Sequence, residues 1–174
     1  WFFNSGYDAL NGNYPFKDYW TIMGPFITFS QALFFKIFGV SWFIYVFHAS
    51  LFNFLISIST FYVLYRFKLN INYCFFYALL TSFISYTSSG TPFVDQHSSI
   101  LSIISLLLFI LAVKFNSNKL WFFIPIILFL SFLSKQTPSA YIFLVIAFLS
   151  VYYFILNFKI NKIFMGLAGS LIII

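Results

Sequence analysis

Ionisable side chains are rare in this chain, and their positions indicate where chemistry could take place. The only carboxylates among its 174 residues are Asp8, Asp18 and Asp95, against nine lysine and arginine residues. A carboxylate can take a proton from a hydroxyl group as a general base, and a lysine ammonium can stabilise the developing negative charge of a phosphate. We therefore expect any reaction centre to be built from these few residues.

The first candidate site is the polar segment 11–20, NGNYPFKDYW, which mixes charged and aromatic side chains. Its candidate binding residues are Tyr14, Lys17, Asp18, Tyr19 and Trp20. Aromatic rings pack against sugar faces, and an ammonium group pairs with a phosphate as a point charge. An aromatic belt at a membrane interface, with a surface ion pair, gives the same pattern without any site, and composition alone favours that interpretation.

Two further candidates lie later in the chain. Asp95 and His97 follow a turn-rich segment at a predicted helix start, where an aspartate can either cap the helix or act as an acid in a cavity. No second metal ligand lies near His97, so the sequence predicts no metal site, although it leaves a divalent metal open. Lys135 follows a short apolar segment, and its ammonium can either face a cavity or extend to the interface. We interpret His48 as a polar group that packs between helices.

The composition indicates a membrane protein. The chain is 62% hydrophobic and 7% charged, with a mean hydropathy of +0.97, whereas soluble domains carry about 25% charged residues. Although the net charge is +6, the basic residues are dispersed and lie at the ends of apolar segments. This distribution follows the positive-inside bias and does not indicate a nucleic-acid partner.

The apolar segments predict an all-α fold, a polytopic transmembrane helical bundle with about five full or partial crossings. These segments are 42–65, 72–88, 98–113, 120–134 and 139–158, and another begins near residue 163. Segment 120–134 is short for a crossing and contains Pro125. Residues 22–38 form a further helix, with Pro25 in its first turn and Gly39 at its end. We treat 1–174 as a single transmembrane domain, in which 1–41 form an outer loop with an interfacial helix and 42–174 the transmembrane helices.

The charges predict an orientation. Segments 66–71, 114–119 and 157–162 hold six of the nine basic residues and no acid, so we expect them in the cytoplasm. Asp95 and the turn predicted at 135–138 then face outside. The N-terminal loop shares that side if 22–38 lies in the interface, and lies inside if 22–38 spans. Charge alone leaves both arrangements open.

Several motifs resemble one family. Residues 11–41, NGNYPFKDYWTIMGPFITFSQALFFKIFGVS, resemble the first outer loop of the GT-C glycosyltransferases. They are most similar to the bacterial branch related to protein O-mannosyltransferases and lipid A aminoarabinose transferases. Residues 1–7 resemble the end of the helix that follows the family's catalytic acid, 92–96 its second outer loop, and 132–138 a lysine-containing break. The resemblance is strong over 11–41 and weak beyond residue 140.

The resemblance implies an integral-membrane glycosyltransferase with a GT-C-like bundle. Such an enzyme moves a sugar from a polyprenyl-phosphate donor to a lipid, glycan or protein acceptor at the periplasmic face of the bacterial cytoplasmic (inner) membrane. Lys17 matches the lysine that approaches the donor phosphate, and Lys135 is a second phosphate-binding candidate. Asp95 matches the second-loop acid. No cofactor is implied.

The resemblance also implies how the other residues take part. The family's acid normally lies a few residues before the position of Trp1, and Asp8 lies too late to match it. We therefore expect a fragment truncated at both ends, with the main catalytic acid upstream and Asp95 assisting. The expected substrate-binding residues are Tyr14, Asp18, Tyr19, Trp20 and His97.

Two other classes compete with this reading. A transporter or flippase of lipid-linked substrates would also contain short, proline-broken helices, but it predicts ionisable groups near the midplane and repeated halves. The acids here lie at segment ends, and the sequence shows no internal repeat. A non-catalytic membrane assembly protein predicts that changing Lys17 or Asp95 has no functional effect.

Overall fold

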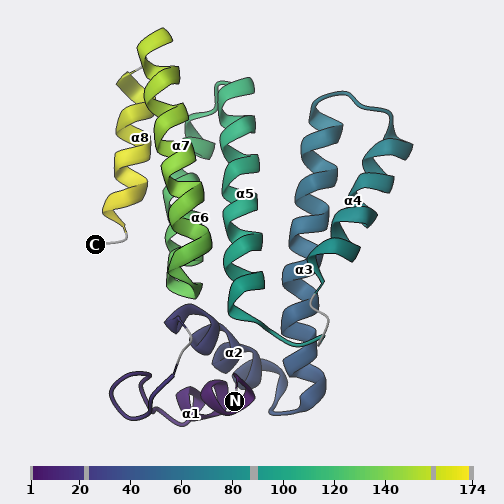
Figure 1. Cartoon of the computed structure of the whole chain (residues 1–174), viewed down its shortest axis with the longest axis vertical. Helices are drawn as coiled ribbons and strands as arrows, with labels where there is room; N and C mark the ends of the chain where they lie inside the picture. Colours follow the sequence, from purple (N-terminus) through teal and green to yellow (C-terminus); the bar gives the residue numbers. More distant parts are fainter. Residues whose placement is uncertain (1, 22–23, 87–89, 158–159, 173–174) are drawn as a thin grey trace.

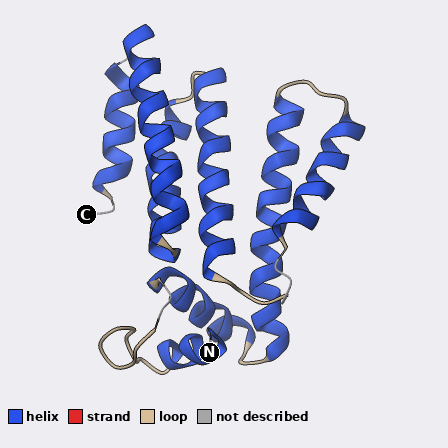
Figure 2. Ribbon diagram, in the orientation of Figure 1, coloured by secondary structure: helices blue, strands red, loops and turns tan. Residues whose placement is uncertain are grey.

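The computed structural model of the chain describes residues 2–21, 24–86, 90–157 and 160–172. These residues form eight helices and no strand, which confirms the predicted all-α fold (Figure 2). The helices are α1 (Phe2–Leu10), α2 (Pro25–Phe38), α3 (Trp42–Arg66), α4 (Ile71–Ser85), α5 (Val94–Lys114), α6 (Asn118–Ser134), α7 (Gln136–Leu156) and α8 (Ile160–Leu171). Helices α3, α5 and α7 are long and apolar enough to cross a membrane, which indicates an integral membrane protein.

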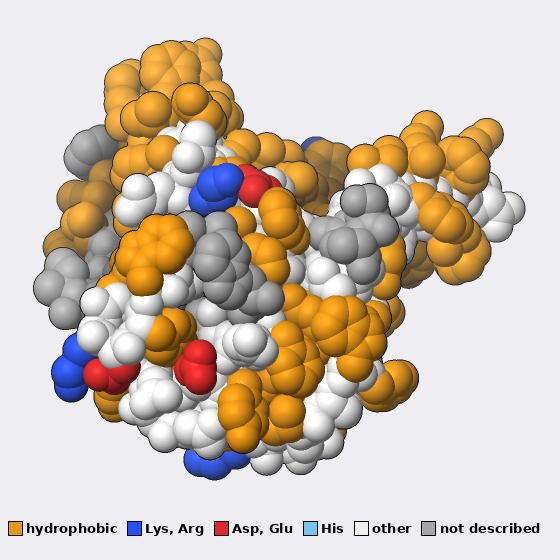
Figure 3. Space-filling view, turned by 60° about the horizontal axis from the view of Figure 1, so that its bottom comes forward, with side chains coloured by type: hydrophobic (Ala, Val, Ile, Leu, Met, Phe, Trp, Pro, Cys, Tyr) orange, Lys and Arg blue, Asp and Glu red, His pale blue; other side chains and the backbone are white. Residues whose placement is uncertain are grey.

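The long helices run between two ends of the molecule (Figure 1), and the sequence gives these ends different charges. Helices α1 and α2 lie across the end at which α3 and α5 begin. We call this the acidic end, because Asp8, Asp18 and Asp95 belong to α1, the loop after it and the first turn of α5. In Figure 3, which brings this end forward, red acidic side chains lie among hydrophobic ones.

The opposite end carries basic side chains. It contains the turns that join α3 to α4 and α5 to α6, together with the start of α8 (Figure 1). We call it the basic end, and its described cations are Arg66, Lys68, Lys114, Lys119 and Lys162. The separation of charges predicted from the sequence is therefore present in the fold.

Several predicted boundaries shift. Helix α5 begins four residues before the predicted 98, and α4 ends at Ser85, which leaves it only 15 residues, or about 22 Å, long. The turn predicted at 135–138 is wrong, because Lys135 alone separates α6 from α7. Pro138 lies in the first turn of α7, where a proline needs no hydrogen-bonded N–H. The N-terminal segment read as a loop begins with α1.

The helix that precedes the bundle has the predicted ends. Pro25 occupies the first turn of α2, and Gly39 closes it with a φ of 89°, a conformation that favours glycine. The side chain of Ser41 then caps α3 by accepting a hydrogen bond from the amide of Ile44 at 3.2 Å. Residues 39–41 link the two helices, and the caps at Gly39 and Ser41 fix where α2 ends and α3 begins.

Helix packing is tightest around α5 and α6. Phe109 of α5 and Trp121 of α6 meet edge to face, with ring centroids 5.5 Å apart, in a cluster that also includes Ile146 of α7. Gly169 brings α8 against α6: a Cβ atom there would lie 2.2 Å from the carbonyl oxygen of Phe122. Helix α7 leaves most of its apolar side chains exposed, as expected for a lipid-facing helix.

Candidate functional site

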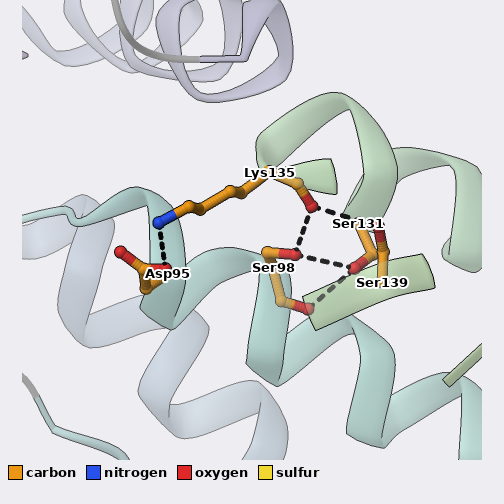
Figure 4. A network of polar contacts seen from close by, with 5 residues as sticks. All are labelled: Asp95, Ser98, Ser131, Lys135 and Ser139. Atoms are coloured by element: carbon orange, nitrogen blue, oxygen red, sulfur yellow. Dashed lines mark hydrogen bonds and ion pairs between the residues drawn. The ribbon is translucent and has the colours of Figure 1, made fainter. Parts of the chain in front are cut away.

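An ion pair joins α5 to the break between α6 and α7. The Nζ atom of Lys135 donates a hydrogen bond to Oδ1 of Asp95 at 2.5 Å, and the two side chains are 41% and 43% exposed (Figure 4). Asp95 does not cap its helix, because Phe93 occupies the N-cap position. It lies in the first turn, where the helix dipole favours a carboxylate. The structure thus brings together two of the predicted site residues.

A group of serines holds the backbone of Lys135 in place. The carbonyl oxygen of Lys135 accepts hydrogen bonds from Oγ of Ser98 at 2.8 Å and Oγ of Ser139 at 3.0 Å. Ser131 donates to the carbonyl oxygen of Ser98 at 2.7 Å. We call Ser98, Ser131 and Ser139 the serine clasp; Figure 4 shows how they surround the break. Small hydroxyl residues let membrane helices approach closely and bond across the interface, so the clasp fixes the origin of the Lys135 side chain.

A polar pocket of about 400 Å³ adjoins this break. It is lined by Phe16, Gly24, Pro25, Phe132, Leu133, Ser134, Lys135, Gln136 and Thr137. The amide of Gly24 donates to the carbonyl oxygen of Ser134 at 3.1 Å. A Cβ atom on Gly24 would lie 1.8 Å from the carbonyl oxygen of Leu133, so only glycine permits this approach. The N-terminal loop therefore forms one wall of the pocket and the α6–α7 break the other.

An apolar groove of about 520 Å³ runs between α6, α7 and α8. It is lined by Pro125, Leu128, Phe129, Phe132, Ser139, Ala140, Phe143, Leu144 and Ser170. Phe132 lines both the apolar groove and the polar pocket, so the two cavities adjoin there. An amphiphilic molecule could place its apolar chain in the groove and its polar group beside Lys135.

The N-terminal loop is held by two of the predicted binding residues. Asp18 accepts a hydrogen bond from the amide of Tyr14 at 2.8 Å, and the hydroxyl of Tyr19 donates to the carbonyl oxygen of Ser5 at 3.0 Å. Partial burial, together with the nearby charge of Asp8, raises the pKa of Tyr19 above its usual value. Tyr19 therefore keeps its proton and its donor role at neutral pH.

The other loop candidates are exposed. Trp20 is exposed, and the ammonium of Lys17 lies 5.7 Å from the ring centroid of Tyr14. Lys17 follows Phe16, which lines the polar pocket, but Lys17 itself does not line it. Lys17 is therefore a neighbour in sequence of a pocket-lining residue, but the structure does not bring it together with Asp95 and Lys135.

A buried histidine pair lies between α2, α3 and α5. His48 and His97 are fully buried, with ring centroids 4.9 Å apart. Nδ1 of His48 lies 2.7 Å from Oε1 of Gln31, and Nδ1 of His97 lies 3.0 Å from the carbonyl oxygen of Phe93. The reading of His48 as a packing group agrees with this arrangement, and substrate binding by His97 stays a prediction. The proximity of the two rings has no local sequence signal, since 49 positions separate them.

Within the described residues, no group of three or more histidine, cysteine, aspartate or glutamate side chains is placed to hold a metal ion. Cys74 is a buried free thiol in α4.

Comparisons with known proteins add no relative. No protein-family model, no curated protein and no solved structure matches the chain. The resemblance to GT-C glycosyltransferases therefore stays a prediction from the sequence motifs.

Proposed function

We propose that this integral membrane protein transfers a sugar from a polyprenyl-phosphate donor to an acceptor at the acidic end, which we place on the periplasmic side of the bacterial inner membrane. The observation that carries the proposal is that the apolar groove and the polar pocket meet at Phe132. Lys135 lines the polar pocket. A polyprenyl-phosphate sugar has the matching parts: a long apolar chain, an anionic phosphate and a polar sugar.

The transfer requires a cation and a carboxylate, and the ion pair of Lys135 and Asp95 supplies both beside this junction. An acceptor oxygen attacks the anomeric carbon, the bond between that carbon and the phosphate oxygen breaks, and the acceptor proton goes to a carboxylate. Negative charge grows on the departing phosphate, and an ammonium aimed at it lowers the barrier. We assign that role to Lys135, which lines the polar pocket.

The carboxylate partner in this proposal is Asp95. Its hydrogen bond to Lys135 orients the ammonium, and we propose that its second oxygen, Oδ2, meets the acceptor hydroxyl. We keep Asp95 in an assisting role, as the resemblance of 92–96 to the second outer loop of the GT-C family implies. The exposed aromatic residues Tyr14 and Trp20 are proposed to contact the sugar.

A flippase of lipid-linked substrates is the second candidate. The observation in its favour is the break at Lys135, since broken helices near an ionisable residue are typical of transport sites. The two functions differ in product: a flippase moves the intact donor between leaflets, whereas a transferase releases polyprenyl phosphate.

The test compares the protein with Lys135→Met in proteoliposomes that contain a radiolabelled polyprenyl-phosphate sugar. Lys36→Met is the matched control, because Lys36 is an exposed lysine in the last turn of α2. We expect Lys135→Met to slow release of polyprenyl phosphate by about 100-fold or more and the control to leave it unchanged. Equal release by all three would contradict the proposal, and leaflet exchange of intact donor without release would favour the flippase.

A further inference from the structure

We infer that the basic end contains a binding site for a phosphate group, separate from the cavities at the acidic end. A pocket of about 340 Å³ lies there, where the turn between α5 and α6 meets the start of α8. We call it the basic-end pocket; its lining residues are Asn116, Asn118, Ile160, Asn161 and Lys162. The inference does not depend on the proposed sugar transfer.

Lys162 supplies a buried positive charge. Lys162 lines the pocket but is only 2% exposed, although the sequence places it in the cytoplasmic segment 157–162. The ammonium donates one hydrogen bond, to the hydroxyl of Tyr153 at 2.9 Å, and lies 5.2 Å from that ring's centroid. An ammonium has three donors, so the neutral phenol uses only part of its capacity.

No carboxylate balances this charge. The three aspartates of the chain all lie at the acidic end, and the ion pair between Lys135 and Asp95 is the only one among the described residues. A buried charge is costly unless an opposite charge or a set of hydrogen bonds compensates it. The protein therefore supplies no carboxylate to compensate the charge of Lys162, and an anion bound from outside would do so.

Two helix N-termini open onto the same pocket. Helix α6 begins at Asn118 and α8 at Ile160, and both run from the basic end towards the acidic end (Figure 1). The N-terminal amides of a helix lack intrahelical acceptors and carry a partial positive charge. The N-cap residue of α6, Ser117, makes no side-chain capping hydrogen bond. Because α6 and α8 are parallel, the partial positive charges of both N-termini lie near the buried ammonium of Lys162.

The donors around the pocket fit a phosphate. Besides Lys162 and the helix amides, Asn118 and Asn161 present exposed side-chain amides that can donate hydrogen bonds. A phosphate offers several acceptor oxygens in different directions and can therefore meet donors from both helices at once. Basic pockets between transmembrane helices also bind the head groups of anionic lipids, which is one source of such a phosphate; a free phosphate ion is the other.

The experiment measures thermal unfolding of the whole chain in nanodiscs of phosphatidylcholine alone, with phosphatidylglycerol added, or with inorganic phosphate added. Two variants change the site in different ways. Lys162→Met removes the buried charge, whereas Asn161→Asp places a carboxylate at the exposed rim of the pocket and leaves the core packing intact. Lys68→Met, at an exposed lysine of the same end that does not line the pocket, controls for net charge.

We expect phosphatidylglycerol to raise the melting temperature of the unaltered protein and of Lys68→Met, and Lys162→Met to weaken the apparent lipid affinity by about tenfold or more. Asn161→Asp should melt higher than the unaltered protein in phosphatidylcholine alone and lose its response to the lipid. Stabilisation by phosphatidylglycerol but not by inorganic phosphate supports a head-group source, and stabilisation by both supports the shared phosphate chemistry. An equal lipid response in all four proteins, or no response in the unaltered protein, would overturn the inference.

Discussion

The ammonium of Lys135 lies 2.5 Å from a carboxylate oxygen of Asp95, although 40 positions separate the two residues in the chain. More than two-fifths of each side chain is exposed, and an exposed ion pair contributes at most about 1 kcal/mol to stability. The pair is therefore better suited to a role in binding or catalysis than to holding α5 against the break.

We expect that the ion pair between Lys135 and Asp95 can be removed without unfolding the protein. Asp95→Asn and Lys135→Met should each change the free energy of unfolding by less than about 1 kcal/mol. Asp95→Asn should also slow sugar transfer less than Lys135→Met, because Asp95 orients groups and Lys135 meets the phosphate charge. Unfolding in nanodiscs and the transfer assay together check this. A large loss of stability in either variant would make the pair structural.

The serine clasp should matter for stability. Ser131→Ala removes the hydrogen bond to the carbonyl oxygen of Ser98 in the buried interface between α5 and α6, and we expect a loss of about 1 kcal/mol. Ser59→Ala is the matched control, since Ser59 bonds only the carbonyl oxygen of Leu55 in its own helix. If both variants unfold at the same temperature, the clasp does not hold the break.

Gly24 should tolerate no side chain. The Cβ atom of Gly24→Ala would lie 1.8 Å from the carbonyl oxygen of Leu133, so the loop must move away, at a cost of roughly 1–3 kcal/mol. Gly166→Ala serves as the control, because a Cβ atom there meets nothing within 4 Å and alanine favours the helix. Unfolding measurements should separate the two, and an unchanged Gly24→Ala would place the loop elsewhere.

The two ends should lie on opposite sides of the membrane. In a Cys74→Ala background, a cysteine placed at Ser117 is expected to react only with reagents that reach the cytoplasm, and one placed at Gly12 only with reagents outside. The physical reason is the excess of basic residues at the end that contains Ser117. Labelling of Ser117→Cys from outside would invert the orientation, and labelling of both cysteines from one side would contradict the placement of α2 at the interface.

Much of the scaffold could be predicted because it depends on local patterns. Apolar runs located the helices, and Pro25 and Gly39 marked the ends of α2. The charge count also placed Asp95 and Lys135 at the same end, although not in contact. The contact depends on the start of α5 at Val94 and on the single-residue break at Lys135. The short polar segments of the sequence do not predict these helix boundaries to the residue.

Other features depend on tertiary packing that the sequence does not reveal. The sequence places Lys162 in the cytoplasmic segment 157–162, but the packing of α8 against α6 buries it beside Tyr153 of α7. His48 and His97 meet only because α3 and α5 pack side by side. In each case the burial of the polar residue depends on two helices that are not consecutive in the chain, α6 with α8 or α3 with α5, so local periodicity does not predict it.

We propose that one polyprenyl-phosphate molecule places its apolar chain in the apolar groove and its phosphate in the polar pocket. Photo-crosslinking tests this proposal most directly. The probe is a polyprenyl phosphate with a photoreactive group on the isoprene unit nearest the phosphate, and mass spectrometry locates the modified residues. The account predicts crosslinks to Phe132, Ser139 or Phe143, competed by unmodified polyprenyl phosphate, retained in Lys36→Met and lost in Lys135→Met. Crosslinks confined to α3 and α4, or unchanged in Lys135→Met, would contradict it.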